Sequence, residues 1–220
     1  MTLSRSVEDY LKAIYAQNAR GEAAGTSELA RVLDVQPASV TGMIKKLAED
    51  GLLEHEPYRG VTLTPTGTRE ALKILRRHRV IETFLVETLG FTWDDVHDEA
   101  ELLEHTASEL LIDRMAEALG NPTTDPHGSP IPTPAGEIDS TVYLALNEVG
   151  PGARITVRSV SDEDAGRLRY FQSVGLVPGA TAVVEAVETA DGTISVTVGD
   201  ASEPLSIAAV AAGRIRVSEG

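Results

Sequence analysis

The stretch that decides the fold of the first third of the chain is LDVQPASVTGMIKKLAEDGLL, residues 33–53. Pro37 fits the first position of a helix, where its missing N–H costs nothing. Apolar residues then recur with the helical period, at Val40, Ile44 and Leu47. Gly51 suits the left-handed residue that follows a helix end. The stretch therefore predicts a helix from Pro37 to Asp50, preceded by a tight turn.

The sequence on both sides of this helix completes a small domain. The expected elements are helices at 6–19 and 26–33, strands at 52–55 and 61–63, and a long helix that Thr64 and Pro65 cap and open. The two strands are joined across Pro57–Gly60. Helices followed by a short hairpin in this order predict a winged helix-turn-helix.

The exposed side of the second helix of this motif has the chemistry of a DNA reader. Its N-terminal end enters the major groove in such domains, and lysines further along contact phosphates. The candidate DNA-binding residues are Gln36, Pro37, Ala38, Ser39, Thr41, Lys45 and Lys46, with Arg59 on the wing. A winged helix that serves dimerisation or protein contacts instead is the open alternative.

A second informative stretch is HDEAELLEH, residues 97–105. In a helix, His97, Glu101, Glu104 and His105 fall within roughly a 100° arc of one face. Imidazole and carboxylate donors on a rigid element suit a divalent metal. The alternative is an acidic amphipathic helix with two incidental histidines.

A further histidine–glutamate pair occurs on the preceding helix. His78 and Glu82 are four residues apart and face one direction. A short turn at Leu89–Phe91 would bring this pair towards the first set of donors. Alone, such a pair is more often a surface salt bridge.

Composition limits the class of protein. The chain of 220 residues has no cysteine, which excludes disulfides, thiolate zinc sites and a cysteine nucleophile. Its net charge is −15, divided as +1 over residues 1–77, −13 over 78–150 and −3 over 151–220. The first third is therefore the part suited to approach a polyanion. No apolar run approaches the ~20 residues of a membrane span, so we expect a cytoplasmic protein without a membrane partner.

The motifs together resemble the diphtheria toxin repressor family of metal-dependent transcriptional regulators. The matching segments are SVEDYLKAIY, LDVQPASVTGMIKKLAEDGLL, YRGVTLTPTG, LRRHRVIETFL, HDEAELLEH and DPHGSPIP, in the family's order over about residues 5–132. The resemblance implies a homodimer that binds operator DNA when metal is bound. It places the primary metal site at Asp9, Glu101, Glu104 and His105, and an ancillary site at His78, Glu82 and His97.

The donor set resembles both metal branches of the family. Acids at Asp9 and Glu101 are like the manganese branch, since the iron branch has methionine and cysteine there, whereas His97 is like the iron branch. The manganese branch also has an acid where this chain has Lys12. Oxygen donors suit Mn2+, with Fe2+ as the alternative. Without metal, we expect repulsion among the carboxylates to loosen their junction with the first helix.

In the C-terminal part of the chain, the apolar residues recur with the period of a strand instead of that of a helix. Residues 121–135 hold five prolines, and beyond Gly150 the segments ARITVRSV, ATAVVEAVE, TISVTVG and RIRVSE alternate as strands. With the VGLVPG turn they resemble the SH3-like barrel of the transport accessory protein FeoA. In some relatives this domain reaches the ancillary metal. The nearest acids here are Glu163 and Asp164, and Arg167 cannot be a ligand.

We therefore predict a mostly α protein with a small β part. The domains are a winged helix-turn-helix (1–73), a helical metal-binding and dimerisation domain (74–136), a linker (137–150) and an SH3-like barrel (151–220). The predicted function is that of a metal-dependent repressor of metal-homeostasis genes, with no catalysis and no small-molecule substrate. A carboxylate–histidine metalloenzyme and a transport accessory are the alternatives, although the Glu-x-x-His of di-iron helices is absent. His55 and His127 are interpreted as surface or turn residues, and Trp93 as packing in the helical domain.

Overall fold

The computed structural model describes residues 3–19, 21–56, 60–188 and 192–220. Its elements divide between two compact units. Unit 1 comprises residues 1–78, 102–112 and 132–138, and unit 2 comprises residues 79–101, 113–131 and 139–220. The boundary falls inside three helices, at residues 78/79, 101/102 and 112/113, so each unit contains part of the helical middle of the chain. None of the helices in the described ranges is long and apolar enough to cross a membrane.

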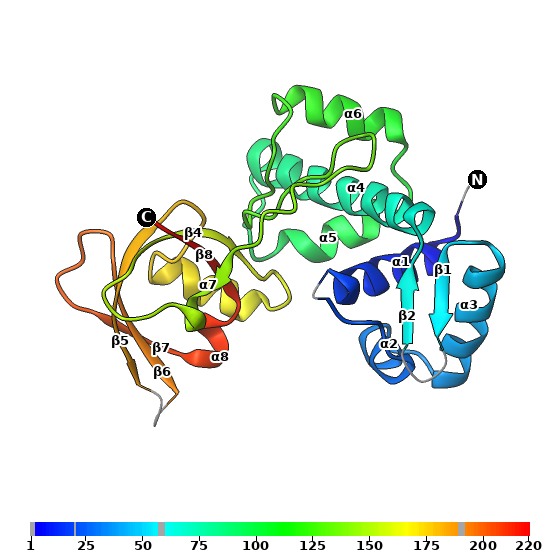
Figure 1. The fold of residues 1–220 in the computed structure, drawn as a ribbon. Helices are drawn as coiled ribbons and strands as arrows, with labels where there is room; N and C mark the ends of the chain where they lie inside the picture. Colours follow the sequence, from blue (N-terminus) through cyan, green and yellow to red (C-terminus); the bar gives the residue numbers. More distant parts are fainter. Residues whose placement is uncertain (1–2, 20, 57–59, 189–191) are drawn as a thin grey trace. The chain divides into compact units, whose positions relative to one another are not determined.

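Unit 1 begins with the predicted winged helix-turn-helix (Figure 1). Its elements are α1 (Arg5–Asn18), α2 (Thr26–Val32), α3 (Pro37–Glu49), β1 (Leu53–Glu56), β2 (Gly60–Leu63) and the first half of α4 (Pro65–Leu89). α3 packs against α2 and β1, while α1 packs against β2. The two strands are antiparallel, with Leu53 opposite Leu63. The core between them is apolar and contains Leu11, Ile14, Leu29 and Leu47, each fully buried.

The boundaries of these helices follow local chemistry. Pro37 stands at the start of α3, and Gly51 follows its end with φ of +71°. The N–H groups of Gly51 and Leu52 bond the carbonyls of Ala48 and Leu47, the pattern of a Schellman end. Thr64 caps α4 by accepting from the Gly67 N–H at 3.0 Å, as predicted. α2 begins at Thr26, and Gly25 takes the extended capping position before it.

Unit 2 contains the second half of α4, most of α5 (Val96–Leu103) and α6 (Glu109–Ala118), and a six-stranded antiparallel sheet. The sheet strands are β3 (Leu144–Ala145), β4 (Arg154–Val160), β5 (Thr181–Glu188), β6 (Thr193–Val198), β7 (Leu205–Ala208) and β8 (Ile215–Glu219). Their spatial order is β3-β8-β4-β5-β6-β7. The short helices η1 (Leu146–Glu148), α7 (Ala165–Ser173) and α8 (Ala209–Ala212) complete the unit.

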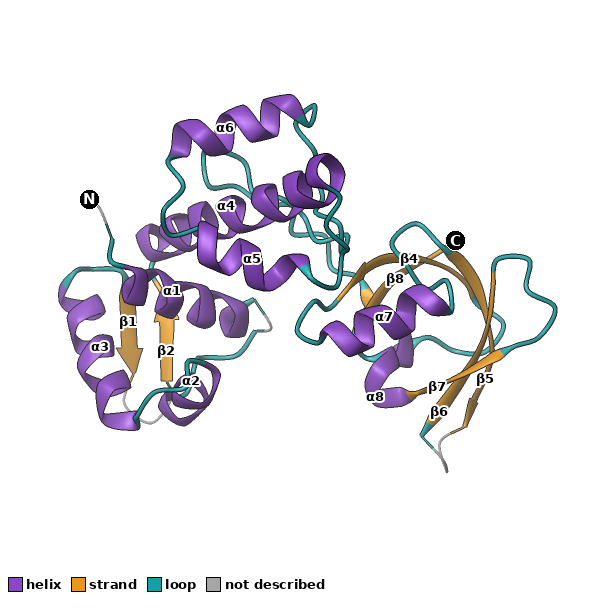
Figure 2. Ribbon diagram, turned by 180° about the vertical axis from the view of Figure 1, so that it is seen from behind, coloured by secondary structure: helices purple, strands orange, loops and turns teal. Residues whose placement is uncertain are grey.

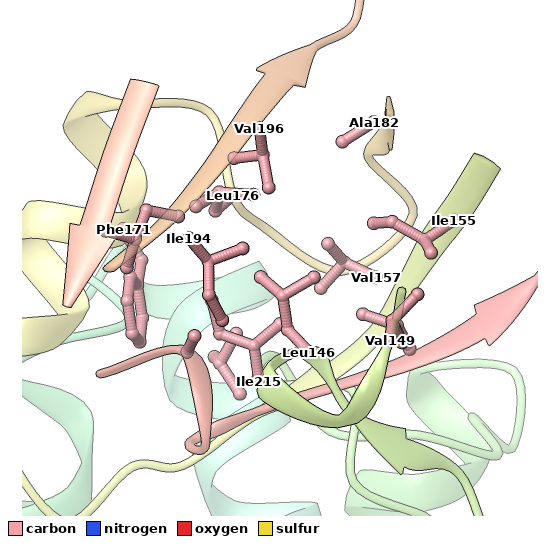
Figure 3. Close-up of a cluster of buried hydrophobic side chains, with 14 of the residues drawn as sticks. Leu146, Val149, Ile155, Val157, Phe171, Leu176, Ala182, Ile194, Val196 and Ile215 are labelled. Carbon is pink, nitrogen blue, oxygen red and sulfur yellow. The ribbon is translucent and has the colours of Figure 1, made fainter. Parts of the chain in front are cut away.

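The sheet curves around one apolar core, as Figure 2 shows from behind and Figure 3 in detail. Alternate residues of β4 face inward, including Ile155 and Val157, and belong to the same buried core as Phe171 from α7. Breaks in the strand register occur between Val157 and Ser159 and between Val184 and Ala186. Such bulges increase local twist and help a sheet to bend. The fold class predicted from the sequence, a mostly α chain with a small β part, is confirmed.

Two segments differ from expectation. Residues 144–149 were placed in the linker, yet β3 and η1 lie there and Leu146 and Val149 are buried in the sheet's core. Trp93 was expected in the core of the helical domain. It packs instead in this same C-terminal cluster, and its indole N–H donates to the Gln172 side chain at 2.9 Å. The reason is its position in the loop after α4, beyond the amphipathic face of that helix.

Candidate metal centres and DNA-contacting helix

Unit 1 brings three of the predicted ligands together. We call Asp9, Glu104 and His105 the first cluster. Asp9 lies on α1, while Glu104 and His105 lie in the turn that follows α5. The His105 Nε2 atom is 3.0 Å from Asp9 Oδ1 and 3.5 Å from Glu104 Oε1. The ligand atoms are thus close enough for one ion to bind them together.

The orientation of His105 is fixed by a second carboxylate. Its Nδ1 lies 2.7 Å from Glu8 Oε2, so Nδ1 carries the proton that Glu8 accepts. Glu8 is held in turn by the Arg77 guanidinium at 2.5 Å, and Arg77 also binds Glu109 at 3.0 Å. The Nε2 lone pair then faces the acids of the first cluster. Nε2 is buried and makes no hydrogen bond among the described residues, which fits an atom that binds a cation.

Glu104 is the most enclosed member of the first cluster. Its side chain is fully buried, and its Oε2 lies 2.6 Å from His78 Nδ1. The Lys12 ammonium group donates to both carboxylate oxygens, at 2.8 and 3.0 Å. Burial acts to raise the pKa of Glu104, but the His78 hydrogen bond and the Lys12 charge outweigh it and hold the pKa below its usual value. The repulsion expected without metal is therefore offset by a neighbouring cation.

Unit 2 holds a second group of donors. We call Glu82, His97, Asp125, His127 and Asp162 the second cluster. His97 Nδ1 lies 3.3 Å from Glu82 Oε1 and 3.7 Å from Asp162 Oδ2. His127 Nδ1 lies 3.8 Å from Glu82 Oε2. Glu82, Asp125 and His127 are buried, so these polar groups are shielded from water.

His127 is presented by a tight turn rather than by a helix. Its Nε2 is 2.7 Å from the Trp93 carbonyl oxygen, which can only accept, so Nε2 is the protonated nitrogen. The buried Nδ1 is left as a lone pair and makes no hydrogen bond within the described residues. Gly128 follows with φ of +83°, and a Cβ there would lie 2.0 Å from the Arg158 carbonyl oxygen. The turn therefore requires glycine next to His127.

Asp125 shapes the same turn. Its Oδ1 accepts from the N–H groups of His127 and Ser129, both at 2.9 Å. Burial raises the pKa of Asp125 to about 6, although the charge of Arg79, whose Nε is 3.3 Å away, acts to lower it. The negative charge of Glu82 adds to the rise. A buried carboxyl group beside a second carboxylate is suited to bind a cation together with Glu82 and His127, because the cation would stabilise its charged form.

Glu101 and the end of α5 account for the remaining predicted ligands of the segment 97–105. Glu101 lies in unit 2, with Oε1 4.0 Å from His97 Nε2. The helix predicted through His105 ends at Leu103, and the Thr106 and Ala107 N–H groups both bond the Leu103 carbonyl. Helix ends commonly tighten in this way.

The acids Glu163 and Asp164, the nearest C-terminal candidates for a metal contact, have other partners in the structure. Asp164 caps α7 by accepting from the Arg167 N–H, and Glu163 binds Arg214 at 3.0 Å. Asp162 is the acid that approaches His97. His127 was expected to be a surface or turn residue; it lies in a turn but is fully buried. His55 is exposed on β1, in line with the same expectation. The sequence Asp-Pro-His at residues 125–127 holds both missed donors, and it is the sequence signal that could have identified them.

The predicted DNA-reading residues line the outer face of α3. Gln36, Pro37, Ala38, Ser39, Thr41, Lys45 and Lys46 are all exposed. Val40, Ile44 and Leu47 face the core on the opposite side. Arg59 lies outside the described residues. A helix with one anchored face and one free face is able to enter a groove without disturbing the domain core.

Four exposed leucines lie in the same unit as the first cluster, two at the end of α5 and two on α6. Leu102 and Leu110 are 59% and 69% exposed, and Leu103 and Leu111 are also open to solvent. We call these four residues the leucine patch. Exposed apolar side chains of this size are typical of a surface that another protein covers.

Comparison with known proteins divides the chain into three matches. Residues 2–61 match the iron dependent repressor N-terminal DNA binding domain, and residues 64–133 match the iron dependent repressor metal binding and dimerisation domain. Residues 144–219 match the FeoA domain.

Whole-length relatives support the same grouping. The chain is 31% identical over 192 residues to the iron-dependent repressor IdeR of Mycobacterium tuberculosis, covering 82% of this chain and 84% of that protein. It is 39% identical over 112 residues to the HTH-type transcriptional regulator MntR of Lysinibacillus sphaericus, and the match covers 51% of this chain and 80% of that protein. A solved manganese-dependent transcriptional repressor in complex with manganese superposes with a TM-score of 0.89 and 39% identity, covering 97% of this chain and all of that one. The solved structure of ScaR with bound Zn2+ superposes with a TM-score of 0.85 and 32% identity, covering 97% of this chain and 99% of that one.

Proposed function

The chain belongs to the iron-dependent repressor family of metal-dependent transcriptional regulators, and from this membership we propose that it represses metal-homeostasis genes by binding operator DNA as a dimer when Mn2+ or Fe2+ is bound. The family consists of repressors rather than enzymes. The observation that carries the proposal is the buried Nε2 of His105, which faces the carboxylates of Asp9 and Glu104. A protein with this DNA-binding role would act in the cytoplasm.

The first cluster would hold the activating ion. Asp9, Glu104 and His105 supply oxygen and nitrogen donors, and the family resemblance adds Glu101 as a fourth ligand. Carboxylates and one imidazole, with no sulfur, suit Mn2+, and Fe2+ is the alternative. His78 contacts Glu104 through Nδ1, so any metal bond that it makes is through Nε2.

The second cluster would hold a supporting ion. The resemblance assigned His78, Glu82 and His97 to it, and the contacts in unit 2 favour adding Asp125, His127 and Asp162. The Nδ1 lone pair of His127 is oriented by the Trp93 carbonyl, as expected for a metal-binding imidazole whose other nitrogen donates a hydrogen bond.

The switch follows from where the ligands of the first cluster lie. Asp9 belongs to α1, which packs against β2 and α2 of the DNA-binding part. Glu104 and His105 belong to the turn between α5 and α6. Asp9, Glu104 and the His105 Nε2 atom would hold the divalent ion, whose positive charge would offset the repulsion between the two carboxylates. Asp9 would then hold α1 in one arrangement, and the paired α3 helices would gain the spacing that successive major grooves require.

DNA contact is proposed for the outer face of α3. Gln36, Pro37, Ala38, Ser39 and Thr41 would face base edges and nearby phosphates, while Lys45, Lys46 and Arg59 would contact the backbone. The proposed domains are those expected from the sequence, with residues 1–73 on the DNA. The leucine patch would form the dimer contact, in the segment that matches a dimerisation domain.

The test is binding to DNA from upstream of the gene, measured by fluorescence anisotropy with Mn2+, with Fe2+ under anaerobic conditions, and with EDTA. Binding should require metal and weaken as salt rises, because lysine contacts displace counterions. Lys45→Ala should weaken binding to all sequences, whereas changes at Ala38 should alter sequence preference. Operator affinity that is the same in excess EDTA would contradict the proposal.

Glu8 should act as a positioning residue for His105. Glu8→Gln removes the charge that orients the imidazole, so Mn2+ affinity of the first cluster should fall by about tenfold, the lower range for an outer partner of a metal ligand. Isothermal titration calorimetry measures this change. Glu109→Gln is the matched control, because Glu109 binds the other side of Arg77 and is largely exposed. Equal losses in both variants would mean that the Arg77 network, rather than the orientation of His105, sets the affinity.

A further inference from the structure

Lys12 lies among the acids of the first cluster, although an ammonium group cannot bind a metal ion. It stands three residues after Asp9 on α1, and both are on the side of α1 that meets Glu104 and His105. Its Nζ contacts both oxygens of Glu104, 92 residues away in the chain. The Lys12 side chain is 18% exposed and that of Glu104 is fully buried. This contact is therefore shielded from water, unlike an ordinary surface pair.

The charges around the first cluster show what this contact does. Three carboxylates meet there, those of Glu8, Asp9 and Glu104. Arg77 binds Glu8, and Lys12 binds Glu104. Lys12 thus supplies to Glu104 the positive charge that a divalent ion would bring to the same carboxylate. A buried carboxylate without such a partner is costly.

We propose that Lys12 is an internal competitor of the activating ion. In the metal-free protein it neutralises Glu104 and links α1 to the turn after α5. An ion that binds Glu104 must share this carboxylate with Lys12 or displace the ammonium group, and it does so against the repulsion between two cations. Lys12 thereby raises the metal concentration at which the protein responds. This inference rests on the proposed metal binding by the first cluster.

The test compares Mn2+ binding by the parent protein and by Lys12→Met, which keeps the length of the side chain and removes its charge. Both carry Asp162→Ala to weaken the second cluster, so that the titration reports the first. Lys12→Met should bind Mn2+ at least about tenfold more tightly, because removing one positive charge within ~4 Å of a divalent ion has an effect of that size even at the dielectric of water. The metal-free variant should melt at a lower temperature, since buried Glu104 loses its partner.

Two matched variants separate charge competition from general effects. Lys12→Arg keeps the charge and should stay within about threefold of the parent affinity, because a guanidinium also binds a carboxylate. Lys73→Met removes a lysine that pairs with Glu70 at the surface of the same unit, and it should change neither measurement. If Lys12→Met does not fold, Lys12→Gln provides the same comparison, since its amide still donates to Glu104.

Unchanged or weaker Mn2+ binding in Lys12→Met would overturn the inference, because Lys12 would then merely position Glu104 for the ion. A failure of the proposed function looks different. In that case the parent protein and its His105→Ala variant would bind the same amount of Mn2+, whatever residue occupies position 12.

Discussion

Replacing Asp9 with alanine is expected to lower metal-activated operator affinity by about 100-fold, near the upper range of coupling between two sites. Asp9 is the residue through which α1 joins the first cluster, with Oδ1 3.0 Å from His105 Nε2. Without it, Glu104 and His105 still bind an ion, but that ion no longer fixes α1. Fluorescence anisotropy with operator DNA at saturating Mn2+ measures the effect.

The variant should remain a dimer and keep much of its metal affinity, which light scattering and calorimetry can check. Glu22→Ala is the matched control, since Glu22 is an exposed acid of the same unit and its loss should leave operator binding unchanged. If Asp9→Ala binds the operator as tightly as the parent protein and still requires metal, then the ion does not act through the first helix.

Replacing Leu110 with glutamate is expected to convert the dimer to a monomer. Leu110 is 69% exposed within the leucine patch, and a buried charge at the centre of an apolar contact costs several kcal/mol. A monomer reaches a single half-site, so operator affinity should fall by about 100-fold or more, given that specific binding relies on two linked half-sites. Analytical ultracentrifugation gives the oligomeric state directly.

Metal affinity provides the internal check on this variant. Because Leu110 is not in the first cluster, Leu110→Glu should bind Mn2+ with nearly the parent affinity. Val210→Glu is the matched control, since Val210 is 77% exposed on α8 in unit 2 and should leave the dimer intact. A dimer that survives Leu110→Glu would place the subunit contact elsewhere.

Local chemistry explains why most of the fold could be predicted. Pro37 and Gly51 mark the ends of α3 whatever the rest of the chain does, and the period-two pattern after Gly150 predicts strands from neighbouring residues alone. The first cluster could be anticipated from a resemblance that carries ligand positions. Asp9 and His105 do lie together, as that resemblance implied.

The rest depends on contacts between distant segments. His127 occupies a proline-rich stretch without any period, so its burial could not be read from its neighbours. Its environment comes from Trp93 and Glu82, far away in sequence. The pairing of Lys12 with Glu104 likewise appears only once α1 is packed against the turn that follows α5. Short-range patterns therefore predicted the elements, while tertiary packing decided which polar groups they enclose.

Because Trp93 contacts His127, the intrinsic fluorescence of Trp93 reports on the surroundings of that histidine. Trp93 is the single tryptophan of the chain, and its ring stacks on the His127 imidazole with centroids 5.7 Å apart. Its carbonyl accepts the hydrogen bond that orients the same imidazole. Any change at His127 therefore alters the surroundings of one chromophore, with no other indole to obscure the signal. Intrinsic fluorescence can thus follow the second cluster by itself, in the unmodified protein, while operator binding is followed by another label.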